Sequence, residues 1–201
     1  KSNPGHPGNA MWVRLRLNLI ADAGIIGLPN VGKSSFLKSI TNADPKIGDY
    51  PFTTLHPNLG VVTYENYEEL IIADIPGIIK NASSGIGLGI KFLGHVEKCK
   101  VLLHFLDCSQ KNIIKNYEII RKELSKYGSG LKEKKEILVL TKSDLINETQ
   151  VNRYSKQLKS YSNKNVIPIS INNLNSLIAL KKLLLSEKNK NKQFGTKTWQ
   201  P

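Results

Sequence analysis

The amino-acid sequence predicts an α/β fold of three layers, in which helices cover both faces of a mostly parallel six-stranded sheet with one antiparallel strand. Short apolar runs alternate along the chain with amphipathic helical patterns, which is typical of right-handed crossovers between parallel strands. Two runs, at 60–64 and 70–73, are separated by a short acidic connection and predict a hairpin. A glycine-rich loop follows the first apolar run, at the carboxyl edge where such sheets bind ligands.

The periodicity of the apolar residues gives the expected elements. It predicts strands at 19–26, 60–64, 70–73, 101–106, 137–140 and 166–169. Apolar residues three and four apart predict one helix directly after the glycine-rich loop and further helices at 88–97, 111–127, 149–161 and 173–187. The helical residues expected to face the core are Phe36, Leu37, Ile40, Ile113, Ile114, Tyr117, Ile120, Leu124, Leu174, Leu177, Ile178 and Leu184.

The chain is expected to divide into three parts. Residues 1–19 begin with a Pro- and Gly-rich stretch, and apolar and polar side chains then alternate, which predicts a half-exposed strand of a preceding module. Residues 20–187 carry the α/β domain. Residues 188–201 are polar and are expected to be disordered.

The composition suits a soluble cytoplasmic protein. The 201 residues are 40% hydrophobic, and no run approaches the ~18 apolar residues of a membrane helix. Early Pro and Gly residues argue against a signal peptide. Cys99 and Cys108 lie in apolar surroundings and are expected to be buried thiols in a reducing compartment. The histidines have no cysteine or carboxylate at the spacing of metal ligands.

The net charge of +13 has two explanations, which the sequence leaves open. An anionic partner is one, and RNA is then the natural candidate. The other is compositional bias, because only four of the 29 basic residues are arginines, at 14, 16, 121 and 153, and phosphate recognition favours arginine.

Residues 27–34, Gly-Leu-Pro-Asn-Val-Gly-Lys-Ser, fit the phosphate-loop pattern G-x-x-x-x-G-K-[ST]. Their position between a buried strand and a helix would aim backbone N–H groups and the positive end of the helix at one point. Lys33 would then reach the β- and γ-phosphates, and Ser34 would offer its hydroxyl to Mg²⁺. An ordinary glycine-rich turn is the alternative, but the strand–loop–helix setting favours a nucleotide site.

Two further motifs fit the γ-phosphate and the metal. Asp74 follows the apolar run at 70–73, where its carboxylate would hold Mg²⁺ through water, and the Gly77 N–H would meet the γ-phosphate. Thr53 and Thr54 lie in a long polar loop, predicted at 43–58, about 20 residues after Lys33, and one of their hydroxyls would complete the metal shell.

Two more motifs fit a guanine base. Residues 141–144, Thr-Lys-Ser-Asp, follow the run at 137–140. The Asp144 carboxylate would accept two N–H groups of guanine, a pair of donors that adenine lacks, while the Lys142 stem would lie over the base. Ser170 and Ile171 follow the run at 166–169 and would support the base from behind.

In this order the motifs resemble the Obg family of GTPases. Residues 20–35 are similar to the phosphate-loop region of that family, 45–62 to its first switch, and 73–79, 85–89 and 92–95 to its second switch. The resemblance covers about residues 12–187. It implies a P-loop GTPase that hydrolyses GTP to GDP with Mg²⁺ and acts in assembly of the large ribosomal subunit. We expect a monomer with no DNA or membrane partner. The resemblance also implies that residues 12–19 are the last strand of the family's N-terminal domain.

The resemblance assigns catalysis to Lys33, Thr54, Asp74 and Gly77. It assigns the metal to Ser34 and Thr54. The residues that it places around GTP or GDP are Gly27, Leu28, Pro29, Asn30, Val31, Gly32, Lys33, Ser34, Ser35, Phe52, Thr53, Thr54, Asp74, Ile75, Pro76, Gly77, Thr141, Lys142, Ser143, Asp144, Ser170 and Ile171.

The chain departs from the family pattern at several positions. Thr141 replaces the usual Asn of N-K-x-D, and Ile171 replaces the usual Ala after Ser. Since Asp144 is retained, we expect the preference for guanine to survive. Ile78 stands where Ras-like enzymes carry the glutamine that orients water, so slow intrinsic hydrolysis is expected. A K⁺ ion held by Asn30 is a further hypothesis, and an Asn that stabilises its own turn is the alternative.

Two other classes of function compete with a GTPase switch. One is an ATP-preferring relative, which Asp144 argues against. The other is mainly an RNA-binding or ribosome-binding module with a regulatory nucleotide pocket that hydrolyses slowly, which the net charge and the missing glutamine keep open.

Overall fold

The computed structural model describes residues 5, 8, 10–12, 21–41, 46–47, 58–64, 68–75, 96–127, 130–131 and 133–192. Among these residues the strands are β1 (Ala21–Gly27), β2 (Lys46–Ile47), β3 (Asn58–Thr63), β4 (Glu69–Asp74), β5 (Cys99–Asp107), β6 (Glu136–Thr141) and β7 (Val166–Pro168). The helices are α1 (Lys33–Ile40), α3 (Ile113–Tyr127), α4 (Glu148–Ser162) and α5 (Leu174–Lys192), with a 3₁₀ turn η1 (Ser143–Leu145).

The strands form one sheet in the order β2-β3-β4-β1-β5-β6-β7. The central strand β1 is parallel to both β4 and β5, and β6 and β7 continue the parallel part. β3 is antiparallel to both of its neighbours. This is the predicted α/β sheet with one reversed strand, and the two-residue edge strand β2 adds to the six strands expected. β2 lies in a stretch that the sequence predicted as a loop.

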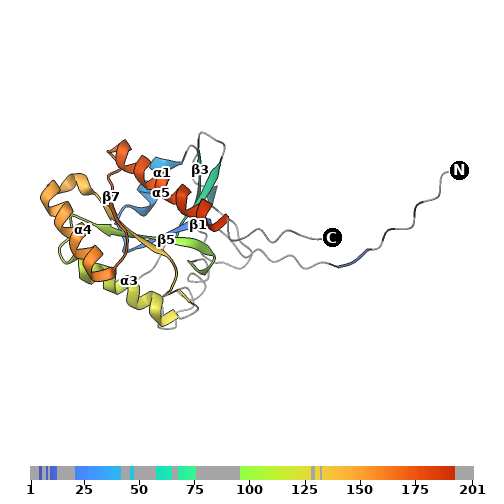
Figure 1. The fold of residues 1–201 in the computed structure, drawn as a ribbon, viewed down its shortest axis with the longest axis horizontal. Coiled ribbons are helices and arrows are strands. Elements are labelled where there is room, and N and C mark those ends of the chain that lie inside the picture. Colours follow the sequence, from blue (N-terminus) through green and yellow to red (C-terminus); the bar gives the residue numbers. More distant parts are fainter. Residues whose placement is uncertain are drawn as a thin grey trace.

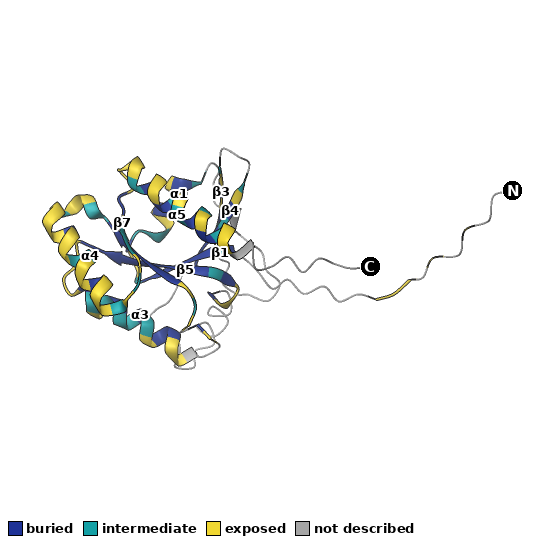
Figure 2. Ribbon diagram, viewed as in Figure 1, coloured by how far each residue is buried: buried dark blue, intermediate teal, exposed yellow. Residues whose placement is uncertain are grey.

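The helices lie on both faces of the sheet, as predicted (Figure 1). α1 and α5 pack on one face, where their buried side chains join alternate residues of the strands in a single cluster. α3 and α4 pack on the other face. Figure 2 shows the strands as a buried layer between helices whose outer surfaces are exposed. The carboxyl ends of the parallel strands therefore form one edge, at which loops from several strands meet.

The predicted inward face of α5 is partly wrong. Leu177 and Leu184 are buried as expected, together with Leu180, but the side chain of Leu174 is 68% exposed and that of Ile178 is 38% exposed. Buried residues at i, i+3 and i+7 define a narrow stripe. Ile178 lies about 100° around the helix from Leu177 and so falls outside the stripe, whereas Leu174 is the first residue of the helix.

The predicted element boundaries differ from the observed ones by a few residues. The largest shift is at α5, which ends at Lys192 instead of residue 187, so the start of the tail predicted to be disordered is helical. Three predicted parts lie outside the described residues. They are the strand at 12–19 apart from Trp12, the helix at 88–97 apart from residues 96–97, and the end of the tail at 193–201. None of the helices in the described ranges is long and apolar enough to cross a membrane.

Both cysteines are buried free thiols, as the sequence predicted. Burial raises the pKa of Cys99 to about 12 and that of Cys108 to about 12. At neutral pH both side chains are therefore protonated and behave as small apolar groups of the core.

Candidate nucleotide-binding site

The loop between β1 and α1 needs its two glycines for different reasons. A Cβ atom on Gly27 would lie 2.7 Å from the carbonyl oxygen of Phe105, so a side chain there would collide with β5. Gly32 has φ 93° and is the left-handed residue directly before α1, a conformation that costs glycine little. Asn30 also has a positive φ, 62°, which asparagine tolerates better than most residues. The chain therefore makes the tight turn that the phosphate-loop motif predicted.

The N-terminus of α1 is open to an anion. α1 has no side-chain cap and no acidic residue in its first turn. Its first backbone hydrogen bond runs from the Phe36 N–H to the Gly32 carbonyl, at 2.9 Å. The N–H groups of the residues before Phe36 therefore have no acceptor within the helix, and they point with the positive end of the helix dipole toward the loop.

Lys33 curls back over this loop. Its ammonium nitrogen donates to the carbonyl oxygens of Gly27 at 3.2 Å and Leu28 at 3.0 Å. Burial lowers the pKa of Lys33, and the nearby charge of Asp74 opposes that shift. The lysine is thus a partly desolvated cation held by weak neutral acceptors, and a phosphate group would bind it more strongly than these carbonyls do.

A hydroxyl and a carboxylate meet beside the loop. The Ser34 hydroxyl donates to Asp74 Oδ2 at 2.5 Å. Asp74 ends β4, which is parallel to β1 with Asp74 opposite Ile25. Asp74 is 2% exposed, and its other oxygen, Oδ1, is buried and has no hydrogen-bond partner among the residues that the structure describes. Buried polar atoms are rarely left unpaired. A hard divalent cation with its water ligands would satisfy this oxygen, so the pair fits Mg²⁺.

Thr141 joins the end of β6 to the phosphate loop. Its hydroxyl donates to the Val31 carbonyl at 2.8 Å and lies 3.3 Å from the Leu106 carbonyl. The threonine is only 4% exposed. The position that normally carries asparagine therefore holds a buried hydroxyl that is directed into the protein.

Lys142 is fixed by an ion pair that the sequence did not predict. Its ammonium nitrogen lies 2.7 Å from Asp107 Oδ2, and the lysine backbone is left-handed with φ 56°. Burial alone would raise the pKa of Asp107, but hydrogen bonds from Lys142 and Ser109 outweigh it and lower that pKa. The carboxylate is therefore charged at neutral pH and holds the lysine stem along the wall of the site.

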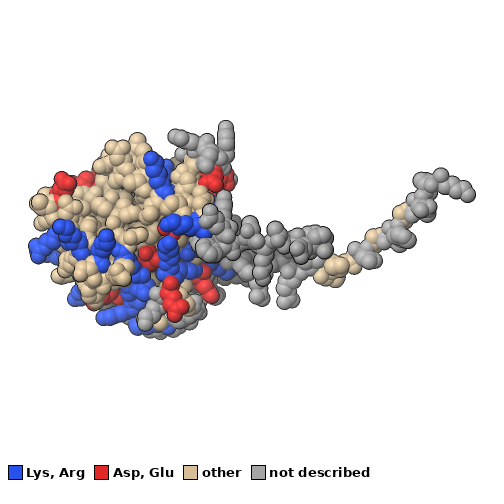
Figure 3. Space-filling view, viewed as in Figure 1, with Lys and Arg blue, Asp and Glu red and all other residues tan. Residues whose placement is uncertain are grey.

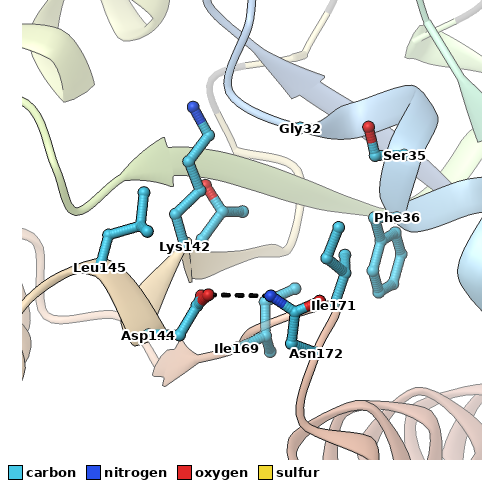
Figure 4. A pocket seen from close by; sticks show the side chains of 10 residues that line it. Gly32, Ser35, Phe36, Lys142, Asp144, Leu145, Ile169, Ile171 and Asn172 are labelled. Carbon is cyan, nitrogen blue, oxygen red and sulfur yellow. Dashed lines mark hydrogen bonds between the residues drawn. The ribbon is translucent and has the colours of Figure 1, made fainter.

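A cavity of about 240 Å³ lies between the phosphate loop and the ends of β6 and β7. Figure 4 shows Lys142 and Leu145 on one side of it and Ser35, Phe36 and Ile171 on the other. Its lining residues are Gly32, Ser35, Phe36, Thr141, Lys142, Asp144, Leu145, Ile169, Ile171 and Asn172. The cavity has apolar walls with a few polar groups, which is typical of a small-molecule site.

Asp144 is the carboxylate of this cavity. Its Oδ2 accepts a hydrogen bond from Asn172 Nδ2 at 3.0 Å (Figure 4). A hydrogen bond from Ser170 is the main reason that the pKa of Asp144 is lowered, and the bond from Asn172 acts in the same direction. Asp144 is thus an exposed, charged acceptor at the mouth of the cavity.

The structure brings most of the predicted site residues to one edge of the sheet. The phosphate loop, Asp74 and residues 141–144 and 170–171 all lie at the carboxyl ends of β1, β4, β6 and β7. Ile75 differs, because its side chain is buried in the core and leaves only backbone for a ligand. The predicted contacts at Phe52, Thr53, Thr54, Pro76 and Gly77 lie outside the described residues.

Sequence reasoning missed Asp107 and Asn172. Asp107 lies at the end of β5, directly opposite Thr141 in the sheet register. A signal was available, since a carboxylate at the end of a parallel strand lies at the ligand edge. Asn172 carried no such signal, because only the fold of the turn after β7 brings its amide to Asp144.

A glycine loop open to anions, a serine–aspartate pair and a carboxylate-bearing cavity at one sheet edge together define a P-loop nucleotide-binding domain. Residues 22–142 match the family of 50S ribosome-binding GTPases. The chain therefore belongs to that family.

The chain is similar in sequence to GTPases called Obg. It is 50% identical to the GTPase Obg of Zymomonas mobilis over 167 residues, which cover 83% of this chain and 48% of that protein. It is 49% identical to the GTPase Obg of Rickettsia prowazekii over 185 residues, which cover 92% of this chain and 56% of that protein. The chain thus spans about half the length of these relatives. The resemblance to the Obg family is confirmed.

Solved structures share the fold at lower identity. The cytosolic domain of the T. maritima FeoB iron transporter in its GMPPNP form has a TM-score of 0.62 at 21% identity, over 83% of this chain and 63% of that one. A variant of Aquifex aeolicus Era bound to GDP and AlF4⁻ has a TM-score of 0.62 at 24% identity, over 81% of this chain and 55% of that one. These likenesses confirm the predicted P-loop fold.

Proposed function

We propose that this chain binds guanine nucleotides with Mg²⁺ and hydrolyses GTP to GDP and phosphate. One observation carries the proposal: a single cavity is lined by Gly32 and Ser35 on the phosphate side and by Lys142 and Asp144 on the base side. A ligand that fills it would therefore contact the anion-binding loop and a base-reading carboxylate at once. The match to a GTPase family and to Obg relatives supports the same function.

The chemistry required of the chain is charge neutralisation around the transferred phosphoryl group. Lys33 would leave the carbonyls of Gly27 and Leu28 and bind the β- and γ-phosphates. Ser34 would ligate Mg²⁺ directly, and Asp74 would hold it through water, which would satisfy the Oδ1 atom that has no partner in the described part of the chain. Thr54 and the Gly77 N–H would complete the catalytic set. When bound by these residues, Mg²⁺ would supply further neutralisation of the phosphate charge.

Hydrolysis is proposed to be slow without a partner, because Ile78 cannot orient water as glutamine does. The left-handed backbone of Asn30 suits an asparagine that serves its own turn, whereas a K⁺ ion at Asn30 is the competing hypothesis. The initial rate of GTP hydrolysis in KCl and in NaCl distinguishes the two, since equal rates would rule out the K⁺ ion.

The proposed role is that of a cytoplasmic switch factor in assembly of the large ribosomal subunit. The family description, the Obg relatives and the net charge of +13 support it. On the face shown in Figure 3, basic side chains spread over α3, α4 and the neighbouring surface with fewer acidic ones among them. Residues 20–187 would form the GTPase domain, residues 1–19 would belong to an Obg-type domain or linker, and residues 188–201 would be a polar tail whose first five residues continue α5.

The net charge also favours a second function, namely an RNA-binding module whose nucleotide pocket is regulatory. Binding of this chain to isolated ribosomal RNA and to 50S particles, with and without GTP at increasing salt, separates the two. A nucleotide switch predicts that affinity for the particle changes with GTP. An RNA-binding module predicts nucleotide-independent binding with a steep salt dependence.

Calorimetric titration of GDP, GTP and ADP with Mg²⁺ tests the nucleotide site. Micromolar binding of GDP and GTP without detectable ADP binding is the expected result. Equal binding of ADP, or no binding at all, would contradict the assignment of the pocket to guanine.

A further inference from the structure

Asn172 and Asp144 come from different loops and meet at the mouth of the cavity. The Asn172 amide nitrogen donates to Asp144 Oδ2 at 3.0 Å, and Figure 4 shows both side chains on the lower wall of the site. Both residues are exposed. An exposed aspartate would sample several rotamers in the absence of such contacts. The Asn172 amide therefore acts together with the hydrogen bond from Ser170 to restrict the orientation of the carboxylate.

The turn that carries Asn172 is itself fixed by hydrogen bonds. The Asn172 N–H donates to the Ser170 hydroxyl at 3.0 Å, and the Ser170 N–H donates to the Ser176 hydroxyl at 3.1 Å. The turn is joined to the Asp144 loop by the Ser143 N–H, which donates to the Ile169 carbonyl at 3.2 Å. The amide of Asn172 therefore projects from a rigid support that is connected to the residue it contacts.

Thr141 cannot take over the recognition of the base. A threonine hydroxyl carries one hydrogen, and that of Thr141 is donated to the Val31 carbonyl at 2.8 Å. No hydrogen is left on this side chain for an acceptor atom of the base. Recognition then depends more heavily on Asp144 than in a site with asparagine at position 141.

We propose that Asn172 is a positioning residue for guanine recognition, which fixes the Asp144 carboxylate so that both of its oxygens face the two N–H donors of the base. The inference rests on the proposed guanine site. A carboxylate offers about four acceptor positions, so Oδ2 accepts from the Asn172 amide and from guanine together. The amide donor at position 172 compensates in part for the missing amide at position 141.

The affinities for nucleotides with and without the 2-amino group of the base report on the orientation of the Asp144 carboxylate. IDP lacks that group and gives Asp144 one N–H donor, whereas GDP gives two. When the carboxylate loses its orientation, GDP loses more than IDP. A general disturbance of the turn would instead weaken both nucleotides equally, so the GDP-to-IDP affinity ratio separates positioning from a structural role.

The experiment is calorimetry with Mg²⁺ on the 201-residue chain with GDP, IDP and ADP, for the unchanged protein, Asn172→Ala and Asn172→Asp. Asn172→Ala is expected to weaken GDP about five- to tenfold, from the loss of a hydrogen bond to a charged group, and to lower the GDP-to-IDP ratio. Asn172→Asp places a second carboxylate beside Asp144 and is expected to weaken GDP further.

Asn173→Asp is the matched control. Its side-chain oxygen accepts from the Ser176 N–H at 3.2 Å at the start of α5, and aspartate fills such a cap equally well. It adds the same charge one residue away, and GDP affinity is expected to stay within about twofold, a free-energy change below ~0.5 kcal/mol.

Three results would overturn the inference. GDP binding by Asn172→Ala that is unchanged or tighter would mean that the amide does nothing or competes with the base. Equal losses for GDP and IDP would show a structural role only. If the unchanged protein bound GDP and ADP alike, the proposed guanine site would fail, and this inference with it.

Discussion

The hydroxyl of Thr141 lies 2.8 Å from the carbonyl oxygen of Val31, so the end of β6 is hydrogen-bonded directly to the phosphate loop. Both residues are buried, at 4% and 2% exposure. The loop that would hold the phosphates and the strand end that would hold the base are therefore positioned relative to each other by one side chain. Threonine at this position, where asparagine is usual, makes this connection and supplies no amide.

Thr141→Val should weaken the protein and its nucleotide binding together. Valine keeps the shape but removes the donor, and a buried carbonyl left without its partner costs ~1–3 kcal/mol. We expect the melting temperature to fall by several degrees and GDP affinity to fall. Thr141→Ser keeps the hydroxyl and should retain most of both properties. If Thr141→Val melted at the temperature of the unchanged protein, the hydrogen bond would not be stabilising.

What the sequence predicted well is local. The β1–loop–α1 unit follows from a contiguous motif, since Gly32 and Lys33 meet requirements set by the loop and the start of the helix. Gly27 belongs to the same motif, although the collision that it avoids is with Phe105 on the distant strand β5. The order of strands and helices follows equally from periodicity, because a continuous apolar run of about six residues is typical of a buried strand.

What the sequence did not predict depends on contacts between distant segments. Asp107 meets Lys142 only because the sheet register pairs Asp107 with Thr141. The two-residue strand β2 exists only by pairing with β3, which no propensity of two residues could indicate. The exposure of Leu174 and Ile178 was also missed. Apolar residues that flank the buried stripe of α5 fit the helical spacing as well as the buried residues do, so the sequence alone does not separate them.

Ser34→Ala should remove the effect of Mg²⁺ on nucleotide binding. The hydroxyl that would ligate the metal is lost, and Asp74 also loses the hydrogen bond at 2.5 Å. The ratio of GTP affinity in Mg²⁺ to that in EDTA is expected to fall toward one. Ser39→Ala is the control, because Ser39 lies on the same helix and its hydroxyl bonds the Phe36 carbonyl. A ratio that survives in Ser34→Ala would exclude the serine as a metal ligand.

Asp144→Asn should change the base that is preferred. Guanine presents two N–H donors, whereas xanthine presents one donor and one carbonyl acceptor, which match an amide. We expect GDP affinity to fall about a hundredfold, since two hydrogen bonds to a charged group are lost, while XDP binding improves. Glu148→Gln removes an exposed carboxylate in the first turn of α4 and controls for charge. Competition between labelled GDP and XDP measures the preference, and an unchanged ratio would remove Asp144 from the base site.

Glu136 should make the stability of the domain depend on pH in the acid range. Its carboxylate is fully buried and lies 2.8 Å from His104 Nδ1, 2.8 Å from Lys164 Nζ and 3.1 Å from Arg121. Burial alone would raise the pKa of Glu136, but the hydrogen bonds and charges of His104 and Lys164 outweigh it and hold that pKa at about 2.

The lowered pKa of Glu136 determines in which direction stability changes with pH. The unfolded chain binds a proton at this glutamate near pH 4.5 and the folded protein only near pH 2, so the stabilisation is complete above about pH 4.5 and is lost as the pH falls toward 2. The difference between the two pKa values corresponds to roughly 3 kcal/mol of folding free energy. Glu136→Gln should remove this part of the acid dependence. At pH 7 it should also cost ~3–5 kcal/mol, because Arg121 and Lys164 lose their buried partner.

Urea unfolding at pH 7, 5, 4 and 3 measures both effects. Glu133→Gln changes an exposed glutamate near β6 and is the control, because an exposed carboxylate contributes little to folding stability. A Glu136→Gln variant that lost stability between pH 5 and pH 3 as steeply as the unchanged protein would show that another group controls the acid response. Equal stability of Glu136→Gln and the unchanged protein at pH 7 would show that the contacts of this carboxylate with His104, Arg121 and Lys164 do not stabilise the fold.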